Sequence, residues 1–222
     1  MKLDDIGLAS LLLADARRHR ALFGAEPNVS RLRLSLGMLS PRFAPVLLYR
    51  LAHACQRVHL SPLAKVFSLL NFMVFGIEIA VSCRIGPGLF FPHTQGTVIG
   101  AVSIGSNAVI YQGVTVGARD LDFTYDEAHR PVIGNDVMLG AGAKVLGGIR
   151  LGDGVTVAAN AVLLMSVPDN AVAGGIPAKI LKQRDSRREI ISVRQESPAG
   201  GTAVLRVRAR HPQRIGAAGG QG

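Results

Sequence analysis

The chain has 222 residues, a formal net charge of +10, two cysteines and no tryptophan. Cys55 and Cys83 are too few for a disulfide framework or a cysteine-based metal cluster. The most apolar run, Val66 to Ile79, is shorter than the roughly 20 residues that a bilayer-spanning helix needs. Asp15 and Arg17 interrupt the apolar stretch near the N-terminus, so we expect no signal peptide and take the cytoplasm as the default compartment.

The first segment, residues 1–76, is predicted to form an N-terminal helical cap. Leu8–Leu22 alternates apolar and charged residues at helical spacing. Pro41 and Pro45 are expected to open a second helix that runs to Val58. A third is expected from Ser61-Pro62, with the serine as its N-cap and the proline as its first helical residue.

The second segment, residues 77–180, carries an aliphatic residue at every sixth position, with two breaks of phase. Glycine often follows this position, and a small or aliphatic residue usually lies four places on. A period of six fits neither an α-helix nor an alternating strand, but it fits a solenoid whose coils have three short flat sides. The aliphatic positions would stack into an internal column. They are Ile79, Ile85, Phe91, Val98, Ile104, Ile110, Val116, Ile133, Leu139, Val145, Leu151, Val157 and Leu163.

The third segment, residues 181–222, is a basic tail. It contains nine Lys or Arg against three acids, which is +6 of the total +10. A basic segment with many glycines and alanines is predicted to be disordered in solvent. Because no aromatic residues are interleaved with the basic ones, we expect no specific nucleic-acid binding.

Both breaks in the repeat contain a histidine. His93 lies where one extra residue precedes Val98, and His129 lies in the polar insertion 118–130, which must protrude from the column. An 18-residue coil would bring Glu78 and His93 to adjacent edges of one turn. A carboxylate on one imidazole nitrogen fixes the tautomer and raises the basicity of the other, as a general base requires. The spacing leaves a structural alternative open, in which His93 binds a backbone carbonyl and Glu78 caps the helix junction.

From residue 41 onward the chain resembles the serine acetyltransferases and their hexapeptide-repeat relatives. The resemblance implies a left-handed parallel β-helix, a mainly β fold. It implies acetyl-CoA as the co-substrate, with no permanently bound cofactor and no metal. His93 would take the proton from an acceptor hydroxyl that attacks the thioester directly, and Glu78 would orient His93. The stretches that carry the resemblance are PRFAPVLLYRLAH (41–53), RIGPGLFFPHTQGTVIG (84–100), IYQGVTVGA (110–118), PVIGNDVMLGAGAKVLGG (131–148) and GGIPAKI (174–180).

The same resemblance implies a homotrimer with each site between neighbouring coils. The expected contacts of the CoA arm and phosphates are Gly117, Ala118, Ala141, Ala159 and Lys179. The expected acceptor-binding residues are His129, Arg130 and Asp126.

The chain departs from the family pattern at three places that concern the acceptor and at its C-terminus. Pro92 replaces an aspartate that binds serine, and Glu78 replaces the shorter aspartate of the dyad. In the loop, the family's Arg-His-Pro becomes His129-Arg130-Pro131, with the two polar residues in exchanged order. The chain ends in Gly222 instead of the isoleucine that such enzymes insert into cysteine synthase, so no complex with that enzyme is expected.

Two acceptors therefore stay open: the hydroxyl of L-serine, for cysteine biosynthesis, and a sugar hydroxyl of an exopolysaccharide. A metal enzyme like the γ-class carbonic anhydrases would need three converging histidines, and the coil region holds two. A non-catalytic trimeric scaffold is the remaining alternative.

Overall fold

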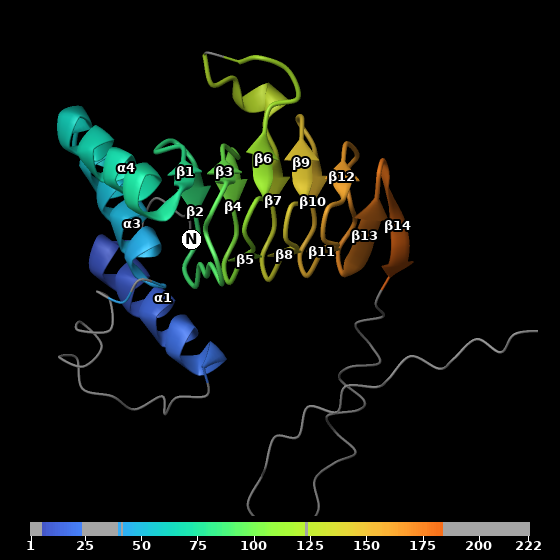
Figure 1. Cartoon of the computed structure of the whole chain (residues 1–222), viewed down its shortest axis with the longest axis horizontal. Helices are drawn as coiled ribbons and strands as arrows, with labels where there is room; N and C mark the ends of the chain where they lie inside the picture. The colour runs from blue at the N-terminus through green and yellow to red at the C-terminus, as the bar shows by residue number, and fades with distance from the viewer. Residues whose placement is uncertain (1–5, 24–39, 41, 123, 184–222) are drawn as a thin grey trace, which may run out of the picture. The chain divides into compact units, whose positions relative to one another are not determined.

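The computed structural model describes residues 6–23, 40, 42–122 and 124–183, which all belong to one compact unit, Met1–Asp185. The predicted disorder of the tail concerns residues outside these ranges, apart from 181–183. In the described residues, the helices α1 (Leu8–Leu22), α3 (Ala44–Arg57) and α4 (Ser61–Phe75) precede a solenoid of short strands (Figure 1). No described helix has the length and apolar character needed to cross a bilayer.

The strands pass in turn to three sheets, so that each of the middle coils adds one strand to each sheet, whereas Phe90 in the first coil and Val167 in the last form only isolated bridges. In the described residues, sheet A has the order β1-β3-β6-β9-β12, sheet B has β10-β7-β4-β2, and sheet C has β14-β13-β11-β8-β5. All these pairs are parallel except β13 with β14. The strands are β1 (Ile77–Ile79), β2 (Arg84–Ile85), β3 (Thr97–Ile99), β4 (Ser103–Ile104), β5 (Val109–Ile110), β6 (Thr115–Gly117), β7 (Val132–Ile133), β8 (Met138–Leu139), β9 (Lys144–Leu146), β10 (Arg150–Leu151), β11 (Thr156–Val157), β12 (Val162–Leu163), β13 (Ala171–Gly175) and β14 (Ala178–Gln183).

The predicted aliphatic column is confirmed at every repeat position but one. Val98 is 39% exposed, and its neighbour Ile99, 1% exposed, takes the internal position and pairs with Ile79 and Val116. The prediction of a single extra residue before Val98 was therefore wrong. The corner that contains His93 has two residues more than the six-residue repeat allows, and the next corner has one fewer. Successive side chains of a strand point to opposite faces, so a shift of one residue turns the inward-facing side chains outward.

The helices form close to where the sequence predicts them. α1 has the expected bounds, and the second helix ends at Arg57, one residue early. In α4 the expected N-cap is displaced by one residue, because Leu60 occupies the cap and Ser61 is already helical. The serine side chain caps no backbone N–H, so α4 begins on the favourable φ of Pro62 alone.

A buried ion pair joins the helices to the first coil. Asp15 of α1 is 0% exposed and lies 2.8 Å from Arg50 of α3, which is 1% exposed. The Arg50 guanidinium also donates to the carbonyl oxygens of Ile85 and Gly86, and the Asp15 carboxylate accepts the N–H groups of residues 88 and 89. All strong polar groups of the pair are thus satisfied, which offsets the cost of burying two charges. A terminal coil needs such a cover, because it would otherwise expose the column.

We expect Asp15→Asn to lower the free energy of unfolding by about 3–5 kcal/mol, because it leaves the buried charge of Arg50 uncompensated. Urea denaturation at fixed protein concentration measures this loss. Arg17→Gln, on an exposed position of the same helix, is the control and should change stability by less than about 0.5 kcal/mol. A loss for Asp15→Asn no larger than that of the control would contradict the role of the pair.

Candidate active site

The corners between sheets stack into edges, and two of these edges carry the predicted site residues. The CA edge consists of the corners that lead from sheet C to sheet A: residues 92–96, 111–114, 140–143 and 158–161. The AB edge consists of the corners that lead from sheet A to sheet B: residues 80–83, 100–102, 118–131, 147–149 and 164–166.

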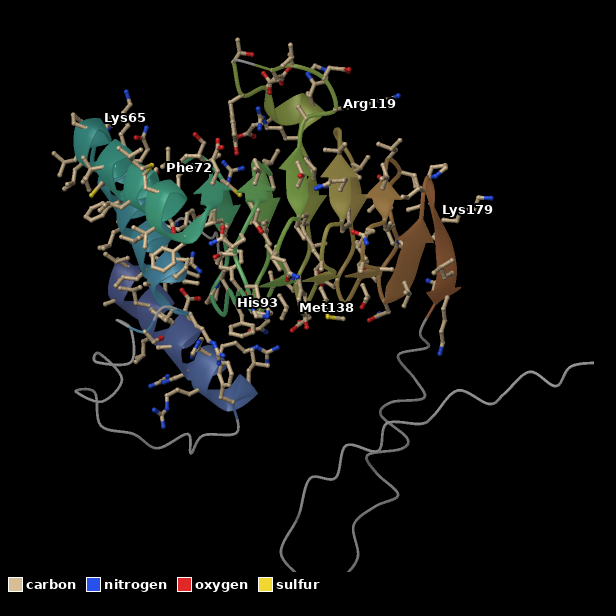
Figure 2. All side chains as sticks on the ribbon, in the orientation of Figure 1. Lys65, Phe72, His93, Arg119, Met138 and Lys179 are labelled. Atoms are coloured by element: carbon tan, nitrogen blue, oxygen red, sulfur yellow. The ribbon has the colours of Figure 1, made fainter. Side chains whose placement is uncertain are left out.

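His93 lies in the first corner of the CA edge, with an exposed side chain. The corner is attached to the end of α4, because the hydroxyl of Thr94 donates to the carbonyl oxygen of Phe75 at 2.7 Å and the N–H of Gly96 donates to that of Gly76 at 2.9 Å. The imidazole lines a cavity of about 440 Å³. Figure 2 shows His93 on the same side of the molecule as Met138, which also lines it. The full lining is Leu22, Phe23, Arg42, Phe90, Pro92, His93, Val109, Tyr111 and Met138.

Glu78 does not share this cavity. It is exposed on β1 and lines a separate cavity of about 700 Å³ together with residues of α4 such as Lys65 and Phe72. Within the described part of a single chain, no hydrogen bond or ion pair joins Glu78 to His93. The structure therefore does not bring the two members of the predicted dyad together in one protomer.

The polar insertion 118–130 protrudes from the AB edge and is folded around Arg130. The Arg130 guanidinium forms an ion pair with Asp122 at 2.8 Å, donates to the carbonyl oxygen of Gly100 at 3.1 Å, and stacks on the ring of Tyr125 at 3.8 Å. The Tyr125 hydroxyl donates to the carbonyl oxygen of Ala101 at 2.7 Å. Arg130 was predicted to bind the acceptor, and in this structure its guanidinium is occupied in holding the loop on the coil.

His129 and Asp126 form the outer part of the loop. Asp126 caps the short helix Glu127–His129 by accepting the N–H of Ala128, and its second oxygen lies 3.1 Å from Nδ1 of His129. The His129 side chain is 71% exposed and lines a cavity of about 360 Å³ with Arg119 and neighbouring loop residues. Figure 2 shows Arg119 and His93 on opposite sides of the molecule. The predicted base and the predicted acceptor-binding loop therefore line different cavities.

The predicted CoA contacts are divided between the same two edges. Ala141 and Ala159 lie on the CA edge with His93, whereas Gly117 and Ala118 lie where β6 leads into the AB loop. Lys179 is exposed on β14, paired with Gly174 at the end of the solenoid away from the helices (Figure 2). Small residues thus border both edges.

The sequence reasoning missed Arg42 and Tyr111, which line the His93 cavity, and Asp122, which holds the loop. Asp122 carried a signal that could have found it, since it is an acid eight residues before an arginine in the same insertion. Arg42 had no such signal, because its place beside His93 depends on how the helical segment packs. Among the described residues, no group of three or more His, Cys, Asp or Glu is placed to hold a metal ion.

Comparisons with known proteins agree with this geometry. The family model "Bacterial transferase hexapeptide (six repeats)" matches residues 130–164, so the chain contains the repeat that defines the hexapeptide class of transferases. The chain is 40% identical over 157 residues to the serine acetyltransferase of Helicobacter pylori strain J99, which covers 70% of this chain and 90% of that relative. It is 32% identical over 189 residues to the serine acetyltransferase of Synechococcus elongatus, with 85% and 75% covered.

Solved structures show the same likeness. Neisseria gonorrhoeae serine acetyltransferase superimposes with a TM-score of 0.72 at 26% identity, over 87% of this chain and 70% of that one. The Brucella abortus strain S19 serine acetyltransferase in complex with coenzyme A gives 0.67 at 29% identity, over 80% and 68%. This chain belongs to the serine acetyltransferase family.

The Asp122 carboxylate gives a testable pH dependence. Burial raises its pKa, but hydrogen bonds from the Asp126 N–H, from Arg130 and from Thr124 outweigh burial and lower the pKa to about 2. An unfolded Asp has a pKa of about 3.9, so this carboxylate stabilises the folded loop fully above that pH and loses the effect as the pH falls towards 2.

We therefore expect Asp122→Asn to speed amide hydrogen exchange at Thr124 and Asp126 several-fold at neutral pH, because both N–H groups donate to the Asp122 carboxylate. Hydrogen-exchange mass spectrometry of the loop peptide measures it. Asp136→Asn, at a distant corner where Asp136 accepts from Asn107, is the control. Equal exchange in both variants would show that Asp122 does not hold the loop.

Proposed function

We propose that this chain transfers the acetyl group of acetyl-CoA to the hydroxyl of L-serine. The observation that carries the proposal is the 40% identity over 90% of a curated serine acetyltransferase. An exposed imidazole in a cavity of about 440 Å³, at the position where the family resemblance implies the base, supports it. A sugar acceptor has no comparable support, since the relatives compared above all act as serine acetyltransferases by name.

In the proposed reaction His93 accepts the proton of the serine hydroxyl as its oxygen attacks the thioester carbonyl carbon. The tetrahedral oxyanion formed would be stabilised by backbone N–H groups of the corner. Its collapse breaks the carbon–sulfur bond, and the departing CoA thiolate takes the proton from His93. The products are O-acetylserine and CoA, and the base is restored without a covalent enzyme intermediate.

We propose that the site is completed between two protomers of a homotrimer of left-handed coils. The CA edge of one protomer would supply His93, and the AB edge of its neighbour would supply His129 and the loop. Glu78, on sheet A at the level of the first coil, would then reach the imidazole from the neighbour. The support is geometric: in one chain the edges are separate and line different cavities. Closed threefold symmetry places the same pair of edges together at every interface.

We place the CoA arm in this interface, along the CA edge. Ala141 and Ala159 are stacked on the same edge as His93, and the small side chains allow close approach of a ligand to the backbone. From the corner of His93 to the turn between β13 and β14 there are four coil steps, or about 19 Å at the usual spacing of 4.7–4.9 Å. An extended pantetheine arm spans a comparable length, which would bring the CoA phosphates near Lys179. Two of the relatives have been solved in complex with CoA.

His93→Ala should lower kcat roughly 10²–10⁴-fold, which is the usual contribution of a positioned general base. Glu78→Gln should lower it less, because it removes only the orientation of the base. Release of free thiol from acetyl-CoA, measured with L-serine and with sugar nucleotides, tests both the base and the acceptor. Thermal unfolding of each variant controls for loss of fold. Near-normal turnover in His93→Ala would remove His93 from the mechanism, and release with sugars alone would overturn serine as the acceptor.

Mixed trimers test whether the site lies between protomers. We expect His93→Ala and His129→Ala subunits, each impaired alone at low serine concentration, to regain activity when they are co-expressed. In random trimers about a quarter of the interfaces would pair an intact His93 with an intact His129, because each interface takes one residue from each neighbour. If the co-expressed subunits are no more active than the two variants purified separately and then mixed, both residues belong to the site of the same protomer.

A further inference from the structure

The cavity beside His93 contains a cationic side chain that the proposed reaction does not use. Arg42 lies in the turn that precedes α3 and lines this cavity together with Phe23, Pro92 and Tyr111. No Asp or Glu is among the described residues of the lining, and the guanidinium of Arg42 supplies a positive charge there. The cavity is therefore suited to an anionic ligand.

The packing of the helical segment holds Arg42 in this place. Phe43, next in the chain, is 2% exposed, and its N–H donates to the carbonyl oxygen of Ser40 at 2.9 Å. The guanidinium carbon of Arg42 lies 5.1 Å from the ring centroid of Phe23, at the end of α1. Phe23 in turn packs against His19 and Phe90. The arginine is thus supported by an aromatic cluster that also forms the cavity wall.

Among the described residues, none forms a polar contact with the guanidinium of Arg42. Its side chain is exposed, and it forms no ion pair or hydrogen bond with any other residue that the structure describes. Its charge acts on the neighbouring aromatic cluster, because burial and then the charge of Arg42 lower the pKa of His19. An arginine that stacks on an aromatic ring keeps the N–H groups at the edge of its guanidinium free to donate two parallel hydrogen bonds to a carboxylate.

We propose that Arg42 binds the carboxylate of the acceptor while His93 takes the proton from its hydroxyl. This proposal rests on the proposed function and specifies its substrate class: short hydroxy acids, recognised through the carboxylate. Within one protomer, Pro92 and the rest of the described lining offer the ammonium of serine no carboxylate. L-serine and a hydroxy acid without an amino group, such as D-glycerate, then compete for the same cavity.

The test compares steady-state kinetics of the wild type, Arg42→Gln and Arg42→Lys with L-serine and with L-serinamide, which lacks the carboxylate. We expect Arg42→Gln to raise KM for serine roughly 10–100-fold, the range for losing hydrogen bonds to a charged group. KM for acetyl-CoA and KM for serinamide should change little. Arg42→Lys keeps the charge but loses the two parallel hydrogen bonds, so its KM for serine should lie between those of the wild type and Arg42→Gln. Arg17→Gln, an exposed arginine outside the cavity, is the matched control.

The outcomes separate this inference from the proposed function. If the wild type acetylates serine and Arg42→Gln leaves KM for serine unchanged, the role of Arg42 is overturned and the proposed function stands. Equal increases in KM for serine and serinamide would show that Arg42 shapes the cavity without binding the carboxylate. That result would also overturn the inference. If the wild type releases no CoA with serine, the proposed function fails, and the assignment of Arg42 fails with it.

Discussion

The buried contact between Asp15 and Arg50 is the interaction on which the candidate site depends. The carboxylate and the guanidinium come from different helices, and together they hydrogen-bond four backbone groups in residues 85–89. That segment leads directly into the corner that carries His93. The first coil has no coil on its outer side, so side chains of the helical segment supply the contacts that a neighbouring coil supplies elsewhere. The helices therefore position the candidate catalytic corner and also form part of the cavity that His93 lines.

A second constraint follows from the three-sided coil. Its corners point in different directions, so residues that are near in sequence can lie on different edges. His93 and the loop around Arg130 illustrate this, because they occupy separate edges of the same solenoid and line separate cavities. A single protomer has the candidate base on one edge and the polar loop on another. The proposed trimer combines them, which gives oligomerisation a chemical role in addition to burying surface.

The sequence predicted the solenoid well because its period is set by packing. Every coil must present aliphatic residues to the same column, and this requirement repeats along the chain independently of the site. The prediction was wrong at Val98, where Ile99 faces inward. At that corner the chain carries extra residues, and a repeat does not specify how an insertion is divided between two corners. Prediction of Ser61 as a cap was wrong for a similar reason, because a one-residue shift leaves the periodicity of α4 unchanged.

By itself, the sequence determined the aliphatic column, the helices before it, the protruding loop and the irregular corner that contains His93. These features come from local periodicity and from residue types that stand out against it. The role of His93 as the candidate base came from the family resemblance, because the spacing left a structural role open. Only the tertiary structure decided that Arg130 holds the loop, that Glu78 and His93 line different cavities, and that Arg42 lines the same cavity as His93. The physical reason is that these relations depend on which corner each side chain leaves and on how the helices pack against the first coil. Neither the choice of corner nor the packing of the helices produces a periodic pattern in the sequence.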